Sequence, residues 1–92
     1  MNYELILMPE AERHLKEWKG SGQKIVLKKI VDLFEELRQH PTTGTGHVEP
    51  LRGNLSGLWS REINKGDRMI YGIEDDKIIV YVVSLKGHYK DK

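Results

Sequence analysis

Residues that together suffice for acid–base chemistry on a phosphodiester lie in the second half of the chain. Glu49 supplies a carboxylate, Arg61 and Arg68 supply guanidinium groups, and His88 supplies an imidazole. A guanidinium binds phosphate or carboxylate oxygens in a bidentate manner, and an imidazole exchanges protons near neutral pH. One group can take the proton of a ribose 2′-hydroxyl while another protonates the leaving 5′-oxygen and the cations stabilise the phosphate. These residues form a complete set for metal-free RNA cleavage if the fold brings them together.

Each of these residues also has a purely structural interpretation. The stems of Arg61 and Arg68 can lie across neighbouring isoleucines while their charged heads reach solvent. A histidine near a terminus is often inert, and Glu49 can simply solvate the surface. Two arginines with Trp59 and Tyr81 between them fit single-stranded nucleic acid equally well, because bases stack on rings while arginines hold the backbone.

The composition argues against several other kinds of site. The chain has no cysteine, so disulfides, thiolate metal sites and cysteine nucleophiles are excluded. The histidines His14, His40, His47 and His88 show no His-x-x-x-His spacing, and we therefore expect neither a metal nor another cofactor. The formal net charge of +1 neither supports nor excludes a nucleic-acid partner.

Size and hydropathy bound the architecture and the location. A chain of 92 residues predicts a single domain over residues 1–92, with a thin core and a site on an open face. No apolar run approaches the roughly 20 residues that span a bilayer. The N-terminus lacks the basic start and apolar core of a signal peptide. We therefore expect no membrane partner and a cytoplasmic location.

The elements that must position the site follow from hydrophobic periodicity. Residues 2–8 predict a strand, which ends at Pro9, a residue suited to the first turn of a helix. This helix and a second one, from about Gln23 to Gln39, are joined at Gly20-Ser21-Gly22 as an antiparallel hairpin. Strands follow from Gly57 onward. The predicted fold class is α+β, with an N-terminal strand, a helical hairpin, and a mostly antiparallel sheet covered by the helices on one face.

A two-residue turn at Lys65-Gly66 predicts the register of the central strands. This register pairs Ile63 with Arg68, Arg61 with Ile70 and Trp59 with Gly72. It places Trp59, Arg61 and Arg68 on the open face, beside Tyr81 from the strand that follows a turn at Asp75-Asp76. The helix-covered face then receives Leu58, Met69, Tyr71, Ile73, Val80 and Val82.

The predicted register also determines on which face of the sheet His88 would lie. Unbroken alternation along the last strand would place His88 on the helix-covered face. Gly87 must redirect the chain, or the register must slip by one residue, if His88 is to meet Arg68.

The central motif resembles that of a known family. From Glu49 onward it reads Glu-Pro-Leu-Arg…Asn-Leu-Ser-Gly-Leu-Trp-Ser-Arg…Asp-Arg-Met-Ile-Tyr, with Gly-His-Tyr near the end. It is similar to the Txe/YoeB family of the RelE/ParE toxin superfamily over nearly the whole chain. This resemblance implies a RelE-like microbial RNase fold and the toxin half of a type II toxin–antitoxin pair. The implied activity is that of a ribosome-dependent mRNA endonuclease, which inhibits translation by cutting mRNA in the ribosomal A site without a metal.

The resemblance also implies roles and partners. Glu49 corresponds to the general base, Arg68 to the group that stabilises the scissile phosphate, and His88 to the general acid, with Tyr89 beside it. The expected RNA contacts are Arg52 and Arg61, with Trp59 as a stacking platform on the open face. The implied partners are a cognate antitoxin, the ribosome and mRNA. Whether the protein also forms a homodimer is not specified by the resemblance.

Two alternatives remain open at this point. A non-catalytic inhibitor with the RelE/ParE fold, acting on a protein target such as gyrase, would need neither Glu49 nor His88. An inactive RNA-binding or protein-binding domain would cause no toxicity at all. The sequence does not specify the codon preference or the identity of the antitoxin.

Overall fold

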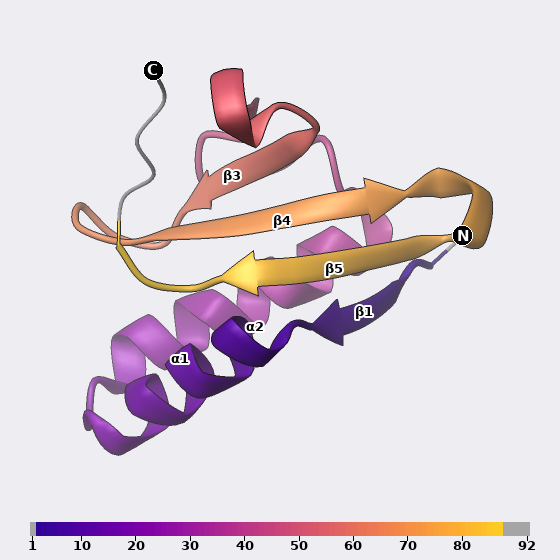
Figure 1. The fold of residues 1–92 in the computed structure, drawn as a ribbon. Coiled ribbons are helices and arrows are strands. Elements are labelled where there is room, and N and C mark those ends of the chain that lie inside the picture. Colours follow the sequence, from indigo (N-terminus) through magenta and orange to yellow (C-terminus); the bar gives the residue numbers. More distant parts are fainter. Residues whose placement is uncertain (1, 88–92) are drawn as a thin grey trace.

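A computed structural model describes residues 2–87 and shows a sheet with both helices on one face (Figure 1). Its sheet runs in the order β1-β5-β4-β3-β2, with β1 parallel to β5 and every other pair antiparallel. This arrangement confirms the predicted α+β class. The regular elements, in chain order, are β1 (Glu4–Leu7), α1 (Pro9–Gly20), α2 (Lys24–Gln39), β2 (Glu49–Pro50), β3 (Leu58–Glu62), β4 (Arg68–Glu74) and β5 (Ile79–Ser84), with short 3-10 turns η1 (Gly53–Leu55) and η2 (Asp75–Lys77).

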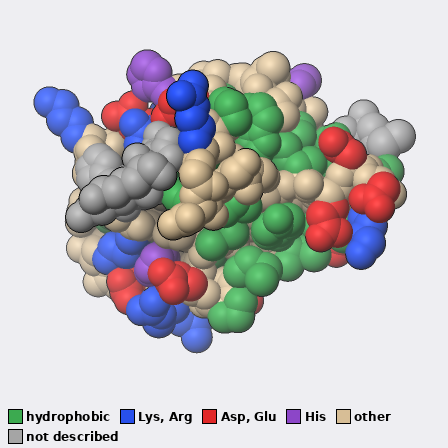
Figure 2. Space-filling view, turned by 45° about the horizontal axis from the view of Figure 1, so that its top comes forward, with side chains coloured by type: hydrophobic (Ala, Val, Ile, Leu, Met, Phe, Trp, Pro, Cys, Tyr) green, Lys and Arg blue, Asp and Glu red, His purple; other side chains and the backbone are tan. Residues whose placement is uncertain are grey.

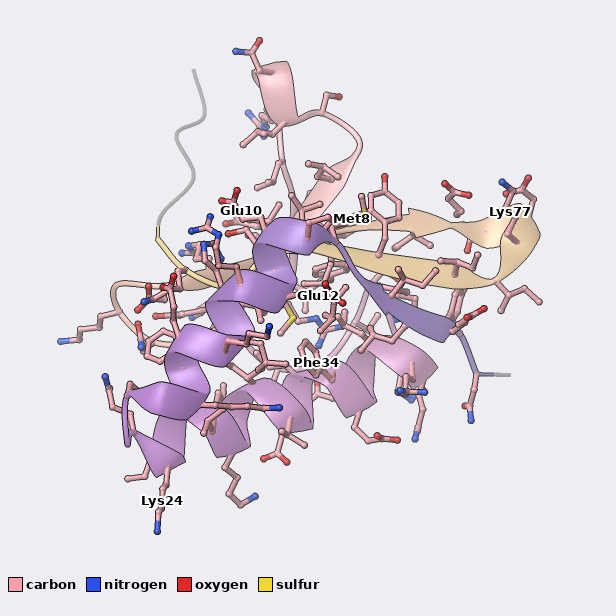
Figure 3. All side chains as sticks on the ribbon, turned by 60° about the horizontal axis from the view of Figure 1, so that its bottom comes forward. Met8, Glu10, Glu12, Lys24, Phe34 and Lys77 are labelled. Atoms are coloured by element: carbon pink, nitrogen blue, oxygen red, sulfur yellow. The ribbon has the colours of Figure 1, made fainter. Side chains whose placement is uncertain are left out.

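The helical hairpin forms as its sequence predicts. Pro9 opens α1, and Glu10 and Glu12 lie in the first turn, where carboxylates interact favourably with the helix dipole. Phe34 of α2 projects into the space between the two helices (Figure 3) and packs against the core. The buried core comprises Ala11, Trp18, Ile30, Leu33, Leu37, Ile63, Met69, Tyr71, Val80, Val82 and Leu85.

The β3–β4 hairpin has a register that differs from the prediction by one residue. The structure pairs Arg61 with Met69 and Trp59 with Tyr71. The turn is longer than expected, because the backbone N–H groups of Ile63 and Asn64 both donate to the carbonyl of Asp67, at 3.0 and 3.2 Å. The Asn64 side chain stabilises this turn by accepting a hydrogen bond from Gly66 N at 2.8 Å.

This slip moves every side chain of β3 to the opposite face of the sheet. Trp59, Arg61 and Ile63 lie under the helices, where Arg61 and Ile63 are buried, so the predicted open-face position of Trp59 and Arg61 is wrong. Leu58, predicted beneath the helices, lies on the open face together with Ser60 and Glu62.

Strand β5 keeps its predicted faces. Val80 and Val82 pair with Ile73 and Tyr71 and are fully buried, while Tyr81 pairs with Gly72 on the open face. A register irregularity between Ile70 and Tyr71 then shifts the pairing by one residue toward Ser84. Gly87 has a positive φ of 81°. The two features that could redirect the end of the chain, a glycine turn at position 87 and a one-residue shift in register, are therefore both present.

Candidate active site

Glu49 and Arg68 meet on the open face, at one end of the sheet. Glu49 lies on β2 opposite Ser60, and Arg68 begins β4 opposite Glu62. Because β3 separates these strands, the guanidinium reaches across it, and Arg68 Nη1 lies 3.7 Å from Glu49 Oε1. The Glu49 side chain is 46% exposed and that of Arg68 is 22% exposed, while Arg68 Nη1 itself is buried. A ligand from solvent would therefore meet Glu49 and the exposed part of the Arg68 side chain. The structure thus brings together two of the predicted catalytic residues.

Ser60 lies between these two strands and was not predicted as a site residue. It is the cross-strand neighbour of both Glu49 and Ile70, and its side chain is completely buried. Within the part of the chain that the structure describes, the Ser60 hydroxyl has no hydrogen-bond partner. Such buried hydroxyls are uncommon, since leaving one unsatisfied costs about 1–3 kcal/mol. Ser60 is the one small residue of β3, whose other residues (Leu58, Trp59, Arg61 and Glu62) are all large, and this contrast is the signal by which the sequence could have identified it.

A second pair, of a histidine and a carboxylate, adjoins the first. His47 Nε2 lies 3.7 Å from Glu62 Oε1, and Glu62 is the cross-strand partner of Arg68. His47 is held in the left-handed region with φ of 53°, and its side chain is 81% exposed. The predicted register paired Ile63, not Glu62, with Arg68, so the sequence did not predict that His47 and Glu62 lie near Arg68.

Arg61 is the main correction to the predicted site. Its side chain is fully buried, and its Nη1 forms a 2.7 Å ion pair with Glu36 Oε1. Its Nη2 donates to the carbonyls of His40 and Thr43, at 2.5 and 2.7 Å, and its Nε donates to the Tyr71 hydroxyl at 3.2 Å. All of its nitrogens are directed into the protein, so Arg61 is not available to hold RNA.

The electrostatics of this buried group follow from its contacts. Burial acts to raise the pKa of the Glu36 carboxyl, but hydrogen bonds from Thr45 and the charge of Arg61 outweigh it, and the net pKa is lowered. Burial raises the pKa of the Tyr71 hydroxyl, with Arg61 opposing the change. Glu36 is therefore a carboxylate and Tyr71 a neutral phenol at neutral pH.

The remaining predicted RNA contacts have mixed outcomes. Trp59 is half-buried and packs against the core beneath the helices, so it offers no stacking platform on the open face. Arg52 is exposed just before η1, three residues after Glu49, and its role stays a prediction. On the open face Tyr81 lies over Gly72, where its ring fills the space that a Cβ would need.

The predicted residues His88 and Tyr89 lie outside the described residues, but the preceding segment is firmly held. Leu85 N donates to His14 Nδ1 at 3.1 Å, and Trp18 Nε1 donates to Leu85 O at 3.0 Å, so α1 binds both backbone groups of one residue. Gly87 O then accepts from Arg68 N at 3.0 Å. The described chain thus ends directly beside Arg68.

A shallow groove continues from this end of the sheet along the open face. It has a volume of about 290 Å³, and its lining includes Leu55 of η1, Ile70 of β4, Ser84 of β5 and Glu10 of α1. Glu10 lies in the first turn of α1 (Figure 3). Figure 2 shows hydrophobic side chains in a band across the molecule, with acidic and basic side chains on either side of it. The lining of this groove is mostly apolar, with one acidic and one basic side chain, Glu10 and Lys86.

Within residues 2–87, no group of three or more His, Cys, Asp or Glu side chains is placed to hold a metal ion. Neither helix in this range is long and apolar enough to cross a membrane.

Sequence comparison identifies relatives over most of the chain. Residues 8–89 match the family described as YoeB-like toxin of bacterial type II toxin-antitoxin system. Toxin YoeB of Escherichia coli is 39% identical over 72 residues, which cover 78% of this chain and 82% of that protein. Toxin YoeB of Synechocystis sp. is 36% identical over 85 residues, covering 92% of this chain and 96% of that protein.

Solved structures agree with this assignment. The YoeB/ParE toxin from Agrobacterium tumefaciens superposes with a TM-score of 0.87 at 27% identity, covering 94% of this chain and 99% of that one. Staphylococcus aureus YoeB, solved as a dimer, gives a TM-score of 0.82 at 30% identity, covering 97% of this chain and 100% of that one. The YoeB-YefM complex of the same organism gives 0.81 at 29% identity, with the same coverage. The chain thus belongs to the YoeB toxin family of type II toxin–antitoxin systems.

Proposed function

We propose that this protein is a ribosome-dependent endoribonuclease that inhibits translation by cleaving mRNA in the ribosomal A site without a metal. The observation that carries the proposal is the pairing of Glu49 with Arg68, 3.7 Å apart on an open face. A half-exposed carboxylate beside a guanidinium combines a proton acceptor with a phosphate-binding group. The groove next to it leaves room for an RNA strand.

The proposed reaction is an internal transesterification. Glu49 takes the proton of the ribose 2′-hydroxyl, and the 2′-oxygen attacks the adjacent phosphorus. Arg68 stabilises the negative charge that develops on the phosphoryl oxygens. His88 donates a proton to the departing 5′-oxygen, with Tyr89 assisting. The products are a 2′,3′-cyclic phosphate and a 5′-hydroxyl end.

The proposal includes partners. The YoeB-YefM complexes of Staphylococcus aureus support a cognate antitoxin for this chain, and the YoeB dimer of that organism supports self-association as a second assembly. An extended antitoxin segment that orders on binding could cover the Glu49–Arg68 pair of so small a protein. The ribosome and mRNA, in the cytoplasm, are the proposed targets.

The test is expression of the protein without an antitoxin, followed by primer extension on a reporter mRNA. Wild type should arrest growth and leave cuts in phase with codons, while Glu49→Ala and Arg68→Ala should abolish both. Glu74→Ala is the matched control, because Glu74 is an exposed acid at the far end of β4, 3.5 Å from Lys77. Growth arrest with intact mRNA would overturn the proposal, and inhibited DNA supercoiling would then favour a gyrase-directed inhibitor.

A further inference from the structure

We infer that Arg61 is a positioning residue whose buried guanidinium fixes the loop of residues 40–48 and thereby sets Glu49 beside Arg68. The catalytic part of this inference rests on the proposed function, in which Glu49 is the base. The structural part rests on contacts within the described chain alone. Arg61 lies on β3, under the helices, on the opposite face of the sheet from the Glu49 and Arg68 side chains.

The loop turns its backbone carbonyls toward one buried group. Arg61 Nη2 binds the carbonyls of His40 and Thr43, and Arg61 Nη1 contacts that of Thr45 at 3.4 Å. The Tyr71 hydroxyl, which accepts a hydrogen bond from Arg61 Nε, donates to the carbonyl of Pro41 at 2.6 Å. Four carbonyls within residues 40–45 are thereby bound by the Arg61–Tyr71 pair.

Glu36 completes the arrangement from α2. Its Oε1 accepts hydrogen bonds from Arg61 Nη1 at 2.7 Å and from Thr45 N at 2.9 Å. Its Oε2 accepts from the Thr45 hydroxyl at 2.7 Å. One carboxylate therefore neutralises the buried cation and binds the loop directly, so the loop is joined to α2 as well as to β3.

The loop has little freedom where it approaches Glu49. Gly44 has φ of 122°, and a Cβ at this position would collide with the Glu36 carboxylate and Arg61 Nη1. Gly46 O accepts a hydrogen bond from Glu62 N at 2.5 Å. The backbone is thus fixed as far as residue 46, three residues before Glu49.

Glu49 depends on this support because its own strand is very short. Strand β2 contains only Glu49 and Pro50, and proline has no N–H to donate to a neighbouring strand. A displacement of about 1 Å in a catalytic group can cost a factor of about 100 in rate. The position of the carboxylate is therefore set jointly by β2 and by the loop that Arg61 holds.

The buried charge of Arg61 has a directional task that an apolar side chain could not perform. Replacing a buried ion pair with hydrophobic residues is often neutral or stabilising. No apolar residue can donate to the five acceptors that Arg61 serves, namely Glu36 Oε1, the Tyr71 hydroxyl and three loop carbonyls. The planar fork of arginine suits this task, and the point charge of lysine does not.

Two mild substitutions test the inference without removing the buried charge. Tyr71→Phe removes the hydroxyl that connects Arg61 Nε to the Pro41 carbonyl, and Thr45→Val removes one donor to Glu36. Tyr3→Phe is the matched control, because its hydroxyl donates to Asp75 Oδ1 at 2.7 Å at the other end of the sheet. Three quantities are measured for each: amide exchange of residues 43–49, the carboxyl carbon resonance of Glu49 in isotope-labelled protein, and kcat and KM on mRNA-programmed ribosomes.

Tyr71→Phe and Thr45→Val should accelerate amide exchange in the loop, shift the Glu49 resonance and lower kcat about tenfold, with KM within about twofold of wild type. Tyr3→Phe should change none of these. An unchanged Glu49 resonance in both loop variants would overturn the inference, as would faster loop exchange with kcat unchanged. If the wild type does not cleave RNA, the proposed function fails, while the exchange and resonance measurements still decide whether Arg61 positions Glu49.

Discussion

At the scale of single residues, two arginines have opposite environments and therefore different tasks. Arg61 is completely buried with Glu36 as its counterion, so all its hydrogen-bonding capacity serves the protein. Arg68 lies on the open face beside Glu49, where its guanidinium can reach the oxygens of a ligand. The difference follows from burial, because a fully buried charge must be paired within the fold, whereas a partly exposed one can exchange water for a new anion.

The Arg61–Glu36 pair predicts a specific acid sensitivity. The folded-state pKa of Glu36 is lowered, so its stabilising contribution is fully present above the unfolded value of about 4.3 and is lost as pH falls through the folded value. Glu36→Gln lacks this titration and leaves Arg61 without its counterion. The unfolding free energy of Glu36→Gln should therefore lie well below that of wild type near neutral pH and approach it in acid.

Urea denaturation at a series of pH values measures this convergence. Asp32→Asn is the control, since Asp32 is an exposed acid on the same helix that pairs with Lys28 at 3.1 Å. Its difference from wild type should be small at all pH values. A gap between wild type and Glu36→Gln that does not narrow as pH falls would show that folding does not lower the pKa of Glu36.

At the scale of elements, the helices could be predicted from the sequence and the hairpin register could not. The periods of α1 and α2 are local properties of the chain, and the core residues Ile30, Leu33 and Leu37 follow from them directly. The β3–β4 register depends on one turn, which is one residue longer than predicted and is stabilised by the Asn64 side chain. A one-residue slip inverts a strand, which explains why Arg61 was placed on the wrong face.

The candidate site was predictable in part for the same reason. Glu49 and Arg68 were expected to act together, and the structure places them together even though the register was wrong. Ser60 and His47 were missed, because their proximity to these residues arises only from the observed pairing of β2, β3 and β4. The faces of β5 were predicted correctly, because the observed pairing keeps Val80 and Val82 on the same face as Ile73 and Tyr71, as the predicted alternation did.

The hydrogen bonds between α1 and Leu85, just after β5, lead to a prediction about stability. Trp18→Phe removes the donor to Leu85 O and leaves a buried carbonyl unsatisfied, which should cost about 1–3 kcal/mol of unfolding free energy. Since Gly87 O accepts from Arg68 N, the loosened segment should also expose the Arg68 amide to faster hydrogen exchange. Thermal denaturation and amide exchange measure the two effects. Equal exchange of the Arg68 amide in both proteins would show that α1 does not restrain this segment.

For the whole molecule, the arrangement of charges matters more than their sum. The formal net charge is only +1, so the proposed attraction to RNA would depend on how charges are arranged near the groove. Glu62 places a carboxylate opposite Arg68, where a phosphate is proposed to bind, and His47 lies 3.7 Å from it. This acid opposes the binding of a polyanion.

Removing that acid should strengthen RNA binding. Glu62→Gln should lower KM on programmed ribosomes about twofold to fivefold at low ionic strength, with the advantage fading as salt screens the interaction. Glu74→Gln changes the net charge equally at the far end of β4 and should leave KM unaltered. A KM that falls equally in both variants would mean that overall charge, and not the arrangement around Arg68, governs association.

One reconstituted reaction measures whether the Glu49–Arg68 pair cleaves mRNA on the ribosome, as we propose. Purified protein is mixed with ribosomes carrying a defined A-site codon, and single-turnover cleavage is followed for wild type, Glu49→Gln, Arg68→Met and Glu74→Gln. We predict a cut within that codon that leaves a 2′,3′-cyclic phosphate, no cleavage without ribosomes, and rates reduced by a factor of about 100 or more in the first two variants alone. Cleavage by Glu49→Gln and Arg68→Met at the wild-type rate would contradict the account.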